Sequence, residues 1–251
     1  MSSTRKGLAF YCFSPPVMMA TFTVEICLAL YAVWRYRLTV VGRLIVATLF
    51  FLALFQLCEY RVCGGWGLEA RAWSRLGYVA ITTLPPIGLH LLFAAAKKQS
   101  RKLIAGAYVV MIGFVGYFLL IPSAFRGYVC TGNYVIFQLG DRASYVYSMY
   151  YYGLLLLVFG YGLHWLTSKE VRSHFSRAQV LAIRWIMIGY LVFLVPTALA
   201  NSVNPKTKAG IPSIMCGFAV IYALILAFVI APKVGTKRSN SPPKRSDSKD
   251  A

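Results

Sequence analysis

The stretch from Trp73 to Ala96 constrains this chain more than any other, because it is long, apolar and followed at once by a basic block. That block consists of Lys97, Lys98, Arg101 and Lys102. At about 1.5 Å per residue the stretch reaches roughly 36 Å, which is enough to cross a hydrocarbon core of about 30 Å. Cations concentrate on the cytoplasmic side of membrane helices, so we expect this segment to enter from outside and to end inside.

The composition of the chain also indicates a membrane protein. Of its 251 residues, 59% are hydrophobic and only 13% are charged, and the mean hydropathy is +0.64. The net charge of +19 comes from 26 Lys and Arg against 7 Asp and Glu. These cations lie mostly in short loops and in the tail rather than on one basic face, so they favour membrane lipid over nucleic acid as a partner.

Apolar segments of similar length predict an all-α domain over residues 1–231, a bundle of seven transmembrane helices. The expected spans are 17–34, 44–62, 73–96, 103–121, 145–167, 179–200 and 210–231. No cleavage site follows the first apolar run, so we expect an uncleaved span rather than a signal peptide. Small residues in the fourth span are expected to let a neighbouring helix approach closely: Gly106, Gly113 and Gly116.

The orientation follows from the basic block after the third span. It places the amino terminus outside and the carboxyl terminus in the cytoplasm, and we expect the inner membrane of a bacterium. Residues 232–251 are rich in Ser, Pro and Lys, which predicts a disordered basic tail on the inner side. Without that tail the two sides hold similar numbers of Lys and Arg, so the orientation then depends on the density of charge in the short inner loops.

The longest loop between spans, residues 122–143, lies outside in this topology. Within it, Gly132-Asn133 separates two apolar runs of β-prone residues, a pattern typical of a short hairpin. We therefore expect a small outer β-hairpin. The next span begins with tyrosines that suit the headgroup region of a membrane: Tyr145, Tyr147, Tyr150, Tyr151 and Tyr152.

Two of the six cysteines, Cys63 and Cys130, fall on the outer side in this topology. They could form a disulfide that fastens the hairpin to the bundle in an oxidising compartment, with Cys12 and Cys58 as competing partners. The remaining two lie inside spans and are expected to be buried apolar fillers: Cys27 and Cys216.

No motif for catalysis is found in the chain. It contains no GxSxG, HExxH, Walker loop or CxxC, so we expect a protein that is not an enzyme. Retinal binding is disfavoured because a Schiff base needs a lysine within a helix, and every lysine here lies outside the expected spans. Two histidines without a nearby third ligand are a weak set for metal or haem, so we expect no metal and no cofactor.

Irregular and ionisable residues inside the spans mark a candidate site for a small-molecule ligand. Pro85 and Pro86 free backbone carbonyls in the third span, which predicts a bend or local unwinding at mid-depth. Glu25 lies at a similar depth in the first span, where a carboxylate is costly unless it is paired or protonated. We expect these residues, with His90, to face one interior cavity that binds the ligand. The alternative is a dry kink packed by neighbouring side chains.

His90, His164 and Arg184 all fall in the inner part of the bundle in this topology. One hypothesis is a polar inner cluster in which His164 and Arg184 lie beside His90. The alternative is that each histidine is hydrogen bonded to a nearby carbonyl group and that Arg184 extends to the lipid headgroups, with no functional role.

A sequence pattern over residues 49–93 gives a further indication. A helix ends in Glu59-Tyr60, and a short turn, Trp73, an LGY step, Pro85-Pro86 and HLLF follow before basic residues. This pattern resembles the seven-helix membrane sensor region at the amino terminus of many bacterial histidine kinases and diguanylate cyclases, and the likeness extends loosely over residues 16–232. No coiled coil, phosphoacceptor segment or cyclase domain follows Pro232. The resemblance therefore implies a stand-alone sensor-like bundle that either signals through a partner protein such as a histidine kinase or has lost signalling.

The sequence supports one favoured function and two alternatives. The favoured function is a non-enzymatic, sensor-like membrane module that binds a small ligand and takes part in signal transduction. The second is a small transporter or permease subunit with a mid-membrane site at Glu25 and the Pro85-Pro86 pair, although no inverted repeat is visible. The third is an intramembrane enzyme using Glu25 or His90, which no motif supports.

Overall fold

The structure is a computed structural model, and it describes residues 15–36, 38–64, 69–130, 135–203 and 210–234. Within these ranges seven helices are long and apolar enough to cross a membrane, which confirms this part of the fold prediction. Six of them are α1 (Pro15–Arg35), α2 (Val40–Gly64), α3 (Ala70–Ala95), α4 (Arg101–Leu120), α5 (Asp141–Thr167) and α7 (Arg177–Val203). The seventh is α8 (Ile211–Leu224), continued by the π-helical segment η3 (Ile225–Ile230) and α9 (Ala231–Val234).

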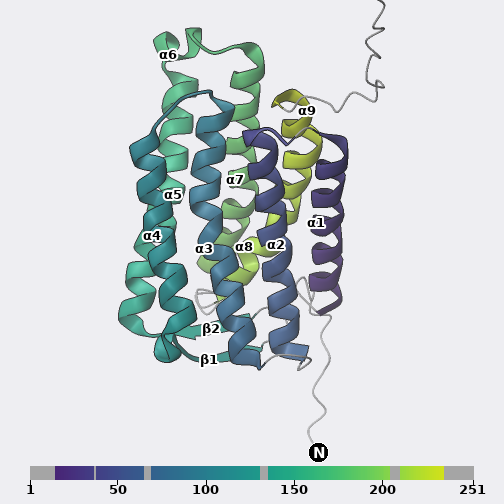
Figure 1. The fold of residues 1–251 in the computed structure, drawn as a ribbon, viewed down its shortest axis with the longest axis vertical. Coiled ribbons are helices and arrows are strands. Elements are labelled where there is room, and N and C mark those ends of the chain that lie inside the picture. Colours follow the sequence, from purple (N-terminus) through teal and green to yellow (C-terminus); the bar gives the residue numbers. More distant parts are fainter. Residues whose placement is uncertain (1–14, 37, 65–68, 131–134, 204–209, 235–251) are drawn as a thin grey trace, which may run out of the picture.

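The long helices lie side by side in one bundle (Figure 1). One end carries the two-stranded sheet and is called the sheet end below. The opposite end carries the α3–α4 turn with its cations and the short helix α6 (Lys169–Ser173), and is called the basic end. The helices α1, α3, α5 and α8 run from the sheet end to the basic end, and α2, α4 and α7 return.

The most buried of these helices is α3. Of its most apolar window 78% is buried, against 11% for α4, because α3 packs against α2, α4, α5 and α7 and against the sheet. Pro85 and Pro86 lie inside α3, and the helix continues through both. The local unwinding expected at these prolines does not occur.

The peripheral position of α4 overturns one expectation from the sequence. Only Ala107 and Phe118 of this helix are buried. Apart from the adjoining residues and the backbone of α4 itself, no atom of the described residues would lie within 4 Å of a Cβ atom added at Gly106, Gly113 or Gly116. These glycines therefore lie on the outside of the bundle and do not admit a neighbouring helix of the described chain.

At the sheet end, β1 (Phe125–Cys130) pairs antiparallel with β2 (Val135–Leu139). The turn expected at residues 132–133 lies outside the described residues. The rings of Phe125 and Phe137 pack on Tyr78 of α3, with centroid distances of 5.0 and 5.4 Å. A disulfide joins Cys63, near the end of α2, to Cys130 of β1, which is one of the pairings that the sequence left open. This sheet therefore closes the end of the bundle over α3.

The structure also shows the burial of the free cysteines within the described residues. Cys58 is a free, buried thiol, and Cys12 lies outside the described residues. Cys216 is buried as expected, whereas Cys27 is exposed on the outside of α1, so the expectation that it fills the core is wrong. The first helix packs mainly against α2 and α8, and Cys27 does not lie on the face that makes these contacts.

The tyrosine belt expected at the start of α5 is only partly present. Tyr145 is 67% exposed, but Tyr147 is 6% exposed and belongs to the core. The ring of Tyr147 lies against Phe118 of α4 and Tyr78 of α3. The helical period places these tyrosines on different faces of α5, so one face packs inward while Tyr145 stays outside.

Candidate functional site

A small cavity lies inside the bundle where α2, α3, α5, α7 and α8 meet. Its volume is about 40 Å³, which is room for only a few water-sized groups. Most of its wall is apolar. The lining residues that matter for its chemistry are Pro85, Tyr151, Tyr190, Cys216 and Tyr222.

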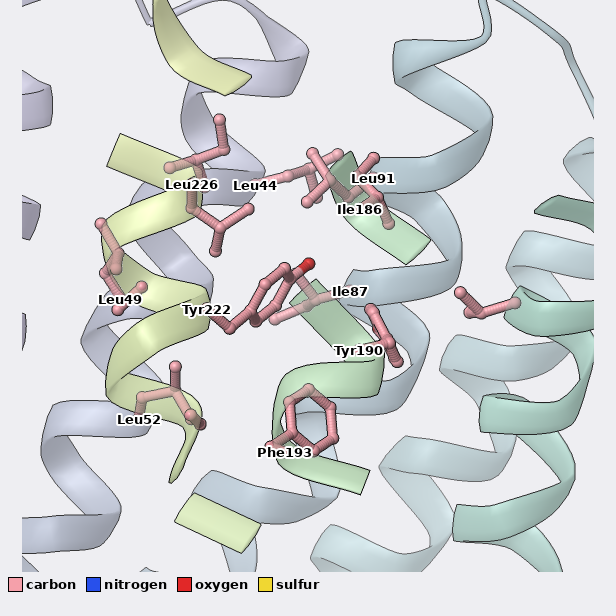
Figure 2. Packing of buried hydrophobic residues seen from close by; sticks show 14 of the residues in the cluster. Leu44, Leu49, Leu52, Ile87, Leu91, Ile186, Tyr190, Phe193, Tyr222 and Leu226 are labelled. Carbon is pink, nitrogen blue, oxygen red and sulfur yellow. The ribbon is translucent and has the colours of Figure 1, made fainter. Parts of the chain in front are cut away.

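Two of the cavity tyrosines fit against glycines of a neighbouring helix. Gly88 of α3 leaves space for the hydroxyl of Tyr190, and Gly189 of α7 leaves space for the ring of Tyr222, because a Cβ atom at either glycine would overlap the tyrosine. Figure 2 shows Tyr222 reaching from α8 toward α7, on which Tyr190 and Phe193 lie. The hydroxyl of Tyr222 is buried and has no hydrogen-bond partner within the described residues.

The carbonyl group that a proline frees in α3 is satisfied by another helix. Pro86 has no N–H group, so the carbonyl of Thr82 lacks its helical donor. The hydroxyl of Tyr150 on α5 donates to this carbonyl oxygen at 2.7 Å. The Thr82 hydroxyl donates to the carbonyl oxygen of Tyr78 at 2.5 Å and lies 3.2 Å from the hydroxyl of Tyr147. The carbonyl of Thr82 therefore does not require a ligand.

A second polar feature lies among α1, α2 and α8. Glu25 of α1 is fully buried, and neither oxygen of its carboxyl group has a hydrogen-bond partner within the described residues. Glu59 of α2, 1% exposed, accepts a hydrogen bond from the hydroxyl of Ser213 on α8. The two carboxyl groups are close enough to interact electrostatically, and the thiol of Cys216 interacts with both. We call Glu25, Glu59, Ser213 and the neighbouring Gln56 the carboxyl cluster.

Glu25 and Pro85, which were expected to face one cavity, do not both line it. Pro85 lines the cavity, whereas Glu25, Pro86 and His90 are not among its lining residues. The first helix packs mainly against α2 and α8, so the inward side chain of Glu25 reaches those helices rather than α3. Cys216 connects the two features, because it lines the cavity and interacts with Glu25.

His90 lies toward the basic end of α3, where its Nδ1 atom is 3.2 Å from the hydroxyl of Tyr108 on α4. It lines a pocket of about 540 Å³ between the start of α2 and the α3–α4 turn. The cations of that pocket are Lys97, Lys98 and Arg101. Neither His164 nor Arg184 lines this pocket, and both side chains are exposed. The pocket thus holds His90 without the other two members of the expected inner cluster.

Arg184 contributes to a different surface feature at the basic end. It lines a groove of about 660 Å³ between α6 and the start of α7. Three further cations line this groove: Lys169, Arg172 and Arg177. His164 is not among the lining residues. Long side chains at a helix end commonly extend to the surface, and Arg184 does so here.

Reasoning from the sequence missed several residues of these features. Gln56, Ser213 and Tyr222 carry no charge, and nothing in the local sequence separates them from ordinary polar residues of a span. Glu59 could have been found, because it is a second acidic residue within an apolar segment, and such residues usually face the bundle interior.

No protein-family model, curated protein or solved structure matches this chain. The described ranges also contain no group of three or more His, Cys, Asp or Glu residues that could hold a metal ion. What the chain does has therefore to be inferred from the cavity, the carboxyl cluster and the contacts of α3.

Proposed function

We propose that this chain is a sensor-like integral membrane module that binds a small ligand, catalyses no reaction and signals through a partner protein such as a histidine kinase. The observation that carries the proposal is the position of the cavity, which borders the most buried helix at Pro85. A ligand there contacts the one helix that touches most of the others. The proposal agrees with the resemblance to the sensor region of histidine kinases and diguanylate cyclases.

The proposed location is a bacterial inner membrane with the sheet end outside and the basic end in the cytoplasm. Two independent features support this orientation. The disulfide between Cys63 and Cys130 needs an oxidising compartment at the sheet end, and cations gather at the other end, as is usual for the cytoplasmic side. Large apolar side chains cover the outside of the bundle and suit contact with lipid, among them Leu30, Leu120, Leu156 and Val203.

The size of the cavity restricts the ligand. A volume of about 40 Å³ is far below the roughly 300 to 1,000 Å³ of sites for larger ligands. The ligand is therefore very small, or it displaces a ring of the wall. Tyr222 is the side chain that gains most from a ligand, because its buried hydroxyl has no partner within the described residues. We infer a small, partly apolar molecule with one hydrogen-bonding group.

Two direct contacts at the basic end would transmit a movement of α3 to the start of α7. The side-chain amide of Gln179, on α7, donates from Nε2 to the carbonyl oxygen of Ala96 at 2.9 Å. The ammonium group of Lys98 lies 5.5 Å from the ring centre of Phe175, which precedes α7. Both contacts join the end of α3 to the segment that bears the basic groove. That groove is the surface we assign to an acidic partner.

The test combines binding with a distance measurement. The full chain in lipid nanodiscs is screened by thermal shift against a panel of small phenols, alcohols and aldehydes. A compound that binds in the cavity should stabilise the natural chain but not Ala219→Leu, which fills the cavity wall, while Leu156→Phe on the exposed face of α5 serves as the control. The same compound should change the distance between spin labels at Gln99 and Lys169. Equal stabilisation of Ala219→Leu would contradict the proposal.

One observation favours a transporter as the second candidate. Two carboxyl groups, Glu25 and Glu59, are buried inside a bundle of helices suited to a membrane, and intramembrane carboxyl groups often mark an ion or substrate path. Reconstitution into proteoliposomes distinguishes the two functions. Saturable uptake of a compound that binds, lost in Glu25→Gln, favours transport, whereas a ligand-dependent change of the spin-label distance without uptake favours sensing.

A further inference from the structure

We propose that the pocket between α2, α3 and α4 at the basic end binds the headgroup phosphate of one anionic phospholipid. We call it the basic pocket; it is the pocket of about 540 Å³ that His90 lines. It shares no lining residue with the basic groove beside α6 or with the ligand cavity inside the bundle. The proposal therefore does not depend on the function proposed above.

The first observation is the charge of the pocket wall. Lys97, Lys98 and Arg101 line the basic pocket, and no Asp or Glu of the described chain is among its lining residues. Three cations on one concave wall repel one another and favour an anion between them. Basic pockets between membrane helices on the cytoplasmic side bind the headgroups of anionic lipids. The charge of the wall thus favours a phosphate group as the occupant.

The second observation is the position of the pocket and its apolar side. It lies where α2 begins, α3 ends and α4 begins (Figure 1), so it is at the level where membrane helices meet the lipid headgroups. Val40, Val41 and Ile104 also line it, and Val40 is 46% exposed. The first carbons of an acyl chain can cover this apolar wall, which a soluble anion would leave in water. The pocket therefore suits a lipid better than a free phosphate ion.

The third observation is the backbone conformation of Lys97. The end of α3 is a Schellman motif, in which the N–H of Lys97 donates to the carbonyl oxygen of Ala94 and the N–H of Lys98 to that of Phe93. This motif gives Lys97 a φ of 53°, and within the described ranges no other residue except glycine has a positive φ. Glycine is the usual residue at this position, because a Cβ atom is disfavoured there. A lysine instead of glycine brings a charge to the pocket at a conformational cost.

The experiment uses the purified full chain in a neutral detergent, where the orientation in a membrane has no influence. Dioctanoyl phosphatidylglycerol is added in increasing amounts, and native mass spectrometry measures the fraction of chains that carry a bound lipid. Binding should saturate at one lipid per chain. It should be at least about tenfold tighter than binding of dioctanoyl phosphatidylcholine, because the lysines repel the choline cation.

Lys97→Gly and Arg101→Gln should each weaken the binding of phosphatidylglycerol by about tenfold, through loss of a charge-assisted hydrogen bond. Glycine suits the left-handed backbone at position 97, so Lys97→Gly should unfold at the same temperature as the natural chain or higher. Lys102→Gln is the matched control, because Lys102 belongs to the same basic block, is exposed and does not line the pocket. Lys98 stays unchanged, since its replacement would also remove the contact with Phe175.

Equal binding of the two lipids would overturn the proposal. Equal losses in Lys102→Gln and Lys97→Gly would overturn it too, because the charge of the whole block would then attract lipid without a site. Ammonium phosphate at the concentration of the lipid should not displace phosphatidylglycerol. Full displacement would assign the pocket to a soluble phosphate compound and would overturn the lipid as its occupant. None of these outcomes bears on the ligand cavity, which is tested separately.

Discussion

The hydroxyl of Tyr150 on α5 donates a hydrogen bond of 2.7 Å to the carbonyl oxygen of Thr82 on α3. That carbonyl is the one left without a helical donor by Pro86, so a side chain supplies what the proline lacks. The bond joins α5 to α3 next to the cavity, and Tyr151, the next residue on α5, lines that cavity. A break in the backbone ladder of one helix has thus become a contact between two helices.

Replacing Tyr150 with Phe should destabilise the chain by about 1 to 3 kcal/mol, because the buried carbonyl of Thr82 then has no donor. The measurement is thermal or denaturant unfolding in detergent. Tyr145→Phe, at an exposed position of the same helix, should change little. Pro86→Ala restores a backbone N–H, so Tyr150→Phe should cost less in that background, and an unchanged cost would show that the hydrogen bond is unimportant.

Gly88→Ala should destabilise the chain by about 1 to 3 kcal/mol, because the added methyl group overlaps the hydroxyl of Tyr190. Tyr190→Phe removes the overlapping oxygen and should recover part of the loss. Gly113→Ala on α4 is the matched control, since a Cβ atom there would meet no described residue within 4 Å beyond its own helix backbone and adjoining residues, and it should be neutral or stabilising by up to about 1 kcal/mol. Similar losses at both positions would contradict this account of the packing.

The disulfide between Cys63 and Cys130 closes a segment with a sequence separation of 67 residues. Cys130→Ser should therefore lower the free energy of unfolding by about 2 to 4 kcal/mol. In intact cells both thiols should resist labelling until a reductant is added. Cys27→Ser is the control, because Cys27 is free and exposed on the outside of α1. Prompt labelling of Cys63 and Cys130 without reductant would contradict a bridge in the cell.

Much of the fold was predictable from the sequence because the length of each apolar segment decides whether a helix can cross a membrane. The seven long helices follow from such lengths, whereas the Cys63–Cys130 pair was one of several pairings that the sequence left open. The sequence does not indicate which helices pack against one another. Glu25 and Pro85 lie at similar depth in the sequence pattern, but depth says nothing about which helix a side chain faces, and α1 packs on α2 and α8.

The partners of the site residues were still less predictable. Ser213 and Glu59 are 154 residues apart, and Tyr150 and Thr82 are 68 residues apart. Each of these contacts depends on the rotation and stagger of two packed helices, which no local pattern encodes. Gly88 could be recognised only once Tyr190 was seen to occupy the space of its missing side chain.

The proposed orientation is tested with reporter fusions. A periplasm-active reporter at Gly132 and a cytoplasm-active reporter at Ser241 should both be active, because cations at the basic end favour the cytoplasm. Replacing the cations after α3, Lys97, Lys98, Arg101 and Lys102, with Gln should weaken this bias. Activity of a cytoplasmic reporter at Gly132, with none at Ser241, would show that the chain is inserted in the opposite direction.

The stability of a Tyr222→Phe variant should depend on whether the cavity holds a ligand. The hydroxyl of Tyr222 is buried and has no partner within the described residues, and removing such a group relieves a desolvation cost of about 1 to 3 kcal/mol. Without ligand, the variant should therefore be more stable than the natural chain in thermal unfolding. With a compound that binds in the cavity the order should reverse or the difference shrink, because only the natural chain hydrogen bonds to the compound.

Tyr145→Phe controls for the loss of a tyrosine hydroxyl at an exposed site. A Tyr222→Phe variant that is less stable without ligand and responds fully to it would show that the hydroxyl already has a partner and does not contact the ligand.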